Sequence, residues 1–202
     1  MDNNIEIRKG LNLIYIATIL DIVSSFLSRS VIAVLVCAAV MLVLYFMATL
    51  KIKDSDENYE RAFVFLIIYT VLDLLNYLFI ARLTDSMLVS LSVTFVLTVV
   101  FALFVFHIIR GTNFLLQKNG YDELVKKGNK AWKLYLVFNV IYLLIVSFVS
   151  LPSYWAAFIF DYLFYNDRGM DFLLILTLLG ILAGIAAKAF YAVYLNKAKE
   201  KV

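Results

Sequence analysis

Six apolar runs divide the chain, and each is long enough to cross a lipid bilayer as a helix. About 20 residues of α-helix span the hydrocarbon layer, which is about 30 Å thick. The strands of a membrane β-barrel would be shorter and would alternate polar with apolar residues, and these runs do not alternate. The sequence therefore predicts an all-α integral membrane protein with six transmembrane helices, at Leu11–Leu27, Val31–Leu50, Ala62–Ala81, Met87–Ile109, Leu134–Leu151 and Phe172–Leu195.

The composition fits the same class. Of the 202 residues, 64% are hydrophobic and 16% are charged, whereas a soluble domain is about half apolar and about a quarter charged. We therefore expect residues 1–202 to form one transmembrane domain in contact with the lipid bilayer. The net charge of +3, with no basic run interleaved with aromatic residues, argues against a nucleic-acid partner. The single cysteine, Cys37, excludes an intrachain disulfide.

Basic residues set the predicted orientation. Lysine and arginine are enriched in the cytoplasmic segments of membrane proteins. If the N-terminus is cytoplasmic, the outer segments hold only Arg29, Arg82 and Arg168, while fourteen basic residues lie in the inner segments. Lys188 lies within the last span and is expected to snorkel inward. The sequence therefore predicts a multi-pass protein of a bacterial-type cell (cytoplasmic) membrane, with both termini in the cytoplasm.

The odd-numbered spans share a pattern of spacing. Nine residues after Lys9, Arg61 and Lys130 come Thr18, Thr70 and Asn139, respectively. Twelve residues after the same basic residues come Asp21, Asp73 and Tyr142. This pattern suggests three tandem two-helix hairpins, since parallel repeats of this kind occur in some transporters. Chance similarity between apolar sequences is the alternative. The span count is similar to that of small bacterial acid-resistance proteins and of vitamin-importer binding subunits, but no motif supports either family.

Two aspartates lie deep in these apolar runs. Asp21 and Asp73 both sit about 18 Å from the inner boundary at 1.5 Å per residue, so equal depth would allow them to meet. A charged aspartate at this depth costs about 2.5–3.5 kcal/mol and usually faces a bundle interior or a cavity. The sequence therefore predicts an intramembrane polar site, with candidate residues Asp21, Asp73, Thr18, Thr70, Asn76, Asn139 and Tyr142.

Two functions fit this polar site. The first is a small transporter, channel or membrane ligand-binding subunit that uses the aspartate pair for a proton or a cation. The second is a non-transporting accessory, immunity or assembly protein, in which the aspartates are hydrogen-bonded glue between helices. Its partner would be a second copy of the chain or another membrane protein. The two hypotheses differ in whether the polar helix faces enclose a hydrated cavity or pack dry.

Other features point to packing and interfacial roles. Small residues at a spacing of four let helices approach closely, which predicts a packing face in the last span at Gly180, Gly184, Ala183 and Ala187. Residues 152–165 are rich in aromatic side chains and predict a helix lying on the outer surface. The inner loop is expected to turn at Gly128-Asn129. His107 is expected at the inner boundary, and one histidine cannot build a zinc site.

No catalytic signature is present. The chain lacks a Walker A loop, Gly-x-Ser-x-Gly, His-Glu-x-x-His and Cys-x-x-Cys, each of which carries a specific chemistry. We therefore expect that the protein is not an enzyme and that it uses no cofactor and no metal.

Overall fold

The computed structural model describes residues 2–26, 31–80, 87–149 and 169–202, and these are helical apart from short connections. All six predicted spans coincide with helices that are long and apolar enough to cross a membrane, which confirms their number. A 3₁₀ turn, η1 (Lys53–Ser55), precedes α3, and a π-helical turn, η2 (Asn76–Ile80), follows it. The long helices are α1 (Asp2–Phe26), α2 (Val31–Ile52), α3 (Glu57–Leu75), α5 (Met87–Lys118), α6 (Asp122–Val149) and α8 (Gly169–Ala198).

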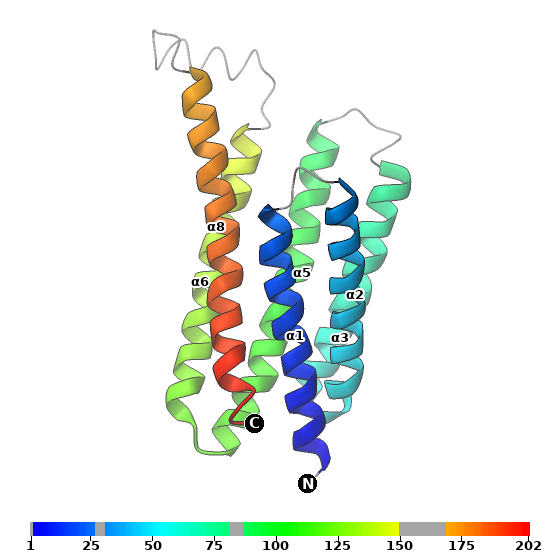
Figure 1. Cartoon of the computed structure of the whole chain (residues 1–202), viewed down its shortest axis with the longest axis vertical. Helices are drawn as coiled ribbons and strands as arrows, with labels where there is room; N and C mark the ends of the chain where they lie inside the picture. Colours follow the sequence, from blue (N-terminus) through cyan, green and yellow to red (C-terminus); the bar gives the residue numbers. More distant parts are fainter. Residues whose placement is uncertain (1, 27–30, 81–86, 150–168) are drawn as a thin grey trace.

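The six helices run side by side, with both chain ends at the same end of the bundle (Figure 1). We call this the N/C end and the opposite end the distal end. The most extensive helix contacts join α1 with α2, α3 with α5, and α6 with α8. Further contacts join α2 with α3, α5 with α6, and α8 with α1. The helices therefore form a closed ring in which the first helix packs against the last.

The packed core is concentrated toward the N/C end. Among the described residues, none is buried in α1 beyond Thr18, in α3 beyond Leu66 or in α6 beyond Tyr135. Likewise, among the residues whose side chains are described, α2 has no buried residue before Tyr45, and α5 has none before Ala102. Since chain direction alternates, all these limits lie near mid-height. The helices are thus tightly packed in one half of the bundle and loosely packed in the other.

The buried residues follow the helix period, with the same spacing in alternate helices. In each of α1, α3 and α6 a first buried position is followed by buried positions three and seven residues later, as expected for one face of a helix. These positions are Ile7, Gly10 and Ile14; Tyr59, Ala62 and Leu66; and Gly128, Ala131 and Tyr135. In α2, α5 and α8 the buried positions include a second shared spacing, at Tyr45, Ala48, Thr49 and Ile52; Phe104, His107, Ile108 and Gly111; and Tyr191, Tyr194, Leu195 and Ala198.

The connection between α5 and α6 differs from the prediction. Gly128 and Asn129 lie inside α6, and the chain turns earlier, at Gly120, whose φ of 80° favours glycine. Gly128 is buried because α6 approaches α5 closely there: a Cβ at this position would lie 2.3 Å from Asn113 Oδ1. The predicted turn was wrong because this glycine serves helix packing.

The predicted surface helix at 152–165 lies outside the described residues, as do the ends of three predicted spans at Leu27, Ala81 and Leu151. At the N/C end the helices extend beyond the apolar runs, since α1 begins at Asp2 and α6 at Asp122. These extensions carry charged residues that the search for apolar runs does not detect.

Candidate functional site

An ion pair lies between the two helices that close the ring. Lys188 Nζ of α8 lies 2.8 Å from Asp21 Oδ1 of α1. Their side chains are 27% and 21% exposed, respectively. Lys188 therefore lies against a carboxylate of the first helix, a partner that its position in the sequence did not indicate. Asp21 lies within hydrogen-bond distance, and pairing offsets the cost of holding either charge in an apolar bundle.

Polar groups surround Asp21. Its backbone carbonyl accepts hydrogen bonds from Ser24 Oγ at 2.8 Å and Ser25 Oγ at 3.1 Å. Its carboxylate also lies within electrostatic range of three tyrosine hydroxyl groups from three other helices. These belong to Tyr45 of α2, Tyr69 of α3 and Tyr135 of α6. The ion pair therefore borders an interior that is partly lined by hydroxyl groups.

Helical spacing places Asp73 on the side of α3 that carries its buried residues. It follows Leu66 by seven residues and Ala62 by eleven, which places all three on one side of α3 at 3.6 residues per turn. Leu66 and Ala62 are fully buried in the core, yet Asp73 is exposed. Asp73 continues the core side of α3 but is exposed, so the packed core does not extend to this height. Tyr77, four residues farther on this side, is 60% exposed.

Both aspartates lie within electrostatic range of one tyrosine, but they are not paired with each other. Tyr69 interacts electrostatically with both Asp73 and Asp21. Asp21 forms its ion pair with Lys188, however, and not with Asp73. Because Lys188 balances the charge of Asp21, Asp73 adds a second carboxylate on the core side of α3.

The other polar residues of the predicted site bond mainly within their own helices. Thr18 Oγ1, Thr70 Oγ1 and Asn139 Nδ2 each donate to the carbonyl four residues earlier, and each of these bonds measures 2.8 Å. Thr18 Oγ1 also lies 3.4 Å from Tyr45 Oη, which links α1 to α2. These side chains therefore satisfy their own polar groups and provide little hydrogen bonding between helices.

Asn76 lies where α3 changes into the π-helical turn η2. Its backbone N–H contacts the carbonyls of Leu72 and Asp73, and its side chain is half-buried. Single π-helical turns interrupt the regular hydrogen bonding of a helix and are frequent at functional sites. The irregularity begins three residues after Asp73, on its distal side.

The small residues of α8 face α6 in the same chain. A Cβ at Gly180 would lie 2.9 Å from Ile145 Cγ2, and one at Gly184 would lie 3.7 Å from Tyr142 Cδ2. Ala183 is 7% exposed. Ala187, one turn farther, is also buried. This places Tyr142, another residue of the predicted site, against α8.

A hydrogen-bonded network near the N/C end was not predicted from the sequence. Tyr194 Oη donates to Asn113 Oδ1 at 2.8 Å, and Asn113 Nδ2 donates to Asn129 Oδ1 at 3.0 Å. Tyr59 Oη lies 3.1 Å from Thr112 Oγ1. The network joins α3, α5, α6 and α8 at a level nearer the N/C end than the Asp21–Lys188 ion pair. Its members lie far apart in the sequence, so no local spacing reveals it.

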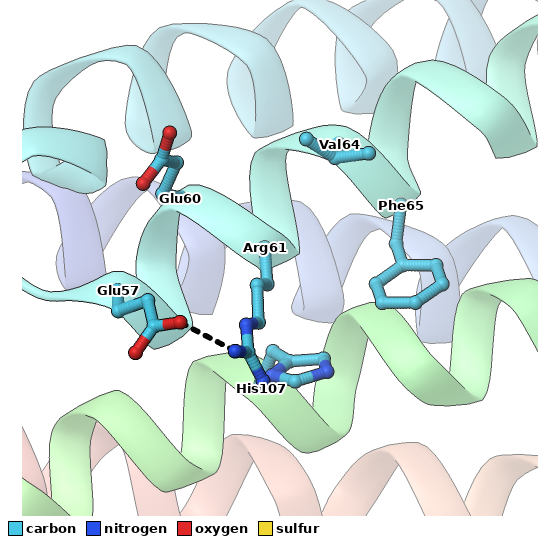
Figure 2. A pocket seen from close by; sticks show the side chains of 6 residues that line it. All are labelled: Glu57, Glu60, Arg61, Val64, Phe65 and His107. Atoms are coloured by element: carbon cyan, nitrogen blue, oxygen red, sulfur yellow. Dashed lines mark hydrogen bonds and ion pairs between the residues drawn. The ribbon is translucent and has the colours of Figure 1, made fainter.

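A crevice of about 400 Å³ opens between α3 and α5 at the N/C end. Figure 2 shows Glu57 and Arg61 joined by an ion pair, with the imidazole of His107 beside the guanidinium. Phe65 stacks on that imidazole with the ring centroids 5.3 Å apart. The lining residues are Glu57, Glu60, Arg61, Val64, Phe65 and His107.

Within the described ranges, no group of three or more His, Cys, Asp or Glu side chains is arranged to hold a metal ion. No family model, curated protein or solved structure matches the chain.

Proposed function

We propose that this chain is a small membrane transporter whose intramembrane site is formed by Asp21, Lys188 and Asp73. The observation that carries the proposal is the ion pair between Asp21 and Lys188, which lies in an apolar six-helix bundle and remains partly exposed. Ionisable residues inside a membrane bundle are rare, and they commonly mark ion or substrate pathways. Asp73, exposed on the side of α3 that continues its core face, supports the same role.

The ion pair offers a simple coupling mechanism. A proton or cation that binds Asp21 competes directly with Lys188 for the carboxylate. Losing this bond weakens the contact between α1 and α8, where the ring closes. Binding and helix movement would thereby be linked, as transport by alternating access requires. Asp73 would hold the cargo or attract it electrostatically.

We also propose that the N/C end faces the cytoplasm and that the chain consists of three tandem two-helix hairpins. The orientation rests on the excess of basic residues at that end. The hairpins are supported by the extensive contacts of α1 with α2, α3 with α5 and α6 with α8, and by the repeated spacing of buried residues.

The orientation predicts which residues can be labelled from each side. In a Cys37→Ser background, cysteines at Ser55 and Glu200 should react with a membrane-impermeant thiol reagent only from the cytoplasmic side. A cysteine at Asn166, between the last two spans, should react only from outside. Labelling of the Asn166 position from the cytoplasm would reverse the proposed topology.

Transport itself can be tested in proteoliposomes. Asp21→Asn and Asp73→Asn keep side-chain shape but remove the negative charge, so each should reduce proton- or cation-dependent flux by at least about tenfold, which corresponds to about 1.4 kcal/mol. Asp122→Asn, an exposed carboxylate at the start of α6, is the matched control and should leave flux unchanged. Unchanged flux in both intramembrane variants would refute the transport proposal.

The same ion pair also supports a second function. It joins the first helix to the last and can act as a purely structural lock. The chain would then be an accessory or assembly protein that works through helix contacts. This alternative predicts that a double variant without either charge, Asp21→Asn with Lys188→Met, keeps all function, whereas the transport proposal predicts that the folded double variant is inactive.

A further inference from the structure

The alignment of α3 with α5 places Asp73 at the level of Thr98. The two helices run in opposite directions (Figure 1), and three side-chain contacts fix their alignment at successive levels. These are Tyr59 Oη to Thr112 Oγ1 at 3.1 Å, Phe65 to His107 with ring centroids 5.3 Å apart, and Tyr69 to Phe101 with ring centroids 5.1 Å apart. Asp73 comes four residues after Tyr69, and Thr98 comes three residues before Phe101. The same alignment therefore brings Asp73 and Thr98 to one level.

Both residues lie on the core sides of their helices. Thr98 precedes Ala102 by four residues and Val105 by seven, and both of these side chains are buried. Such spacing defines one face of a helix, and Thr98 is itself half-buried on that face. Since α3 and α5 are among the most closely packed helix pairs, a carboxylate of one helix and a hydroxyl group of the other share a level on the core side of the pair.

The hydroxyl groups at this level have already used their hydrogen-bond donors. Thr98 Oγ1 donates to the carbonyl of Thr94 at 2.8 Å, and Thr70 Oγ1, three residues before Asp73, donates to the carbonyl of Leu66 at 2.8 Å. A hydroxyl group has one donor and two acceptor lone pairs, so each oxygen has only acceptor capacity left. Among the described residues, no side chain donates a hydrogen bond to the Asp73 carboxylate or forms an ion pair with it. Acceptors thus gather here without a donor.

We propose that Asp73, Thr98 and Thr70 bind a small alkali-metal cation of the sodium type, which is the cargo of the proposed transporter. Hard cations take oxygen ligands such as these. One carboxylate balances one positive charge, whereas Ca²⁺ takes about six to eight oxygen ligands, which commonly include several carboxylates. A proton needs only the carboxylate and gives the threonine oxygens no role. An anion would meet acceptors alone.

The backbone beside Asp73 fits the same ligand. The π-helical turn η2 begins three residues after Asp73 and interrupts the regular hydrogen bonding of this span. In several transporters, interrupted helices present backbone carbonyls to sodium ions within the membrane. The inference rests on the proposed function for the movement of the cation across the membrane, but cation binding can be measured without it.

Thermal unfolding of the purified full-length protein in detergent tests binding alone. Replacing choline chloride with sodium chloride at equal ionic strength should raise the melting temperature, because a cation that binds the folded state stabilises it. Choline carries the same charge but is too large to be coordinated by these oxygens. Replacing the chloride with gluconate should change nothing. Equal melting temperatures in sodium, potassium and choline chloride would overturn the proposal.

Variants assign the sodium effect to this site. Asp73→Asn removes the charge, and Thr98→Val removes the oxygen while keeping the shape, so each should abolish the shift. Thr98→Ser restores a hydroxyl group and should retain it. Thr49→Val is the matched control, since Thr49 Oγ1 makes the same kind of bond to its own helix, to the carbonyl of Tyr45 at 2.8 Å, in the packed half of the bundle. A sodium-dependent shift that survives in Thr98→Val contradicts the site.

Flux in proteoliposomes separates this inference from transport itself. Thr98→Val should reduce sodium uptake by at least about tenfold, which corresponds to about 1.4 kcal/mol. If Asp21→Asn and Asp73→Asn reduce flux while Thr98→Val leaves it unchanged, the cargo is a different ion and this inference fails, although the transport proposal stands. If sodium stabilises the wild type through Thr98 but both aspartate variants leave flux unchanged, the cation site stands and the transport proposal fails.

Discussion

Replacing Lys188 with methionine is expected to lower the free energy of unfolding by about 2–3 kcal/mol. Methionine keeps the length and apolar stem of lysine but removes the ammonium group, which leaves Asp21 without its ion-pair partner. A carboxylate in an apolar bundle must then stay charged without compensation or take up a proton, and both cost free energy. Unfolding in mixed detergent micelles, followed by circular dichroism, measures the difference.

Two further variants separate the ion pair from other effects of the substitution. The double variant Asp21→Asn with Lys188→Met removes both charges and should recover most of the lost stability, since neither partner is left unpaired. Lys197→Met removes an exposed lysine near the end of the same helix and should change stability by less than about 0.5 kcal/mol. A Lys188→Met protein as stable as the wild type would show that the ion pair does not hold α1 against α8.

The number of spans was predictable because it depends on a local property. A run of about 20 apolar residues has few alternatives to a membrane-spanning helix, and the six helices found are apolar and long enough for this role. The turn predicted in the inner loop was wrong because the role of Gly128 is not a local property. Gly128 has the composition of a turn, but its role depends on Asn113 and Tyr194 from other helices, which only the packed bundle brings near.

The intramembrane site was predictable in part. Asp21 and Asp73 were recognised as sites of interest because charges in apolar runs are costly, and their equal distance from the basic boundary predicted similar depth. The sequence did not reveal that Lys188 is the partner of Asp21, because 166 residues separate them. One signal was available: Lys188 is a lone basic residue inside an apolar run.

The spacing shared by α1, α3 and α6 bears on two questions: which face of each helix packs in the core, and whether the helix pairs arose as repeats. Gly10, Ala62 and Ala131, which directly follow Lys9, Arg61 and Lys130, are all buried, and so are Ile14, Leu66 and Tyr135, four residues farther on. Helical periodicity alone predicts such an arrangement for any helix that packs on one side. The spacing therefore identifies the core face of each helix, while the origin of the three pairs as repeats stays a prediction.

The transport proposal requires water inside the distal half of the bundle, and a cysteine in place of Asp73 tests this most directly. Thiols react with charged reagents as thiolates, which form where water reaches them. In a Cys37→Ser background in proteoliposomes, Asp73→Cys should react with a charged, membrane-impermeant thiol reagent added on the distal side.

Val71→Cys is the matched control, since Val71 is exposed on the same helix but points away from the interior. The account predicts rapid labelling at position 73 and almost none at position 71. Failure of both positions to react, or equal reaction of the two, would mean that Asp73 does not face a hydrated interior, and it would contradict the proposed site.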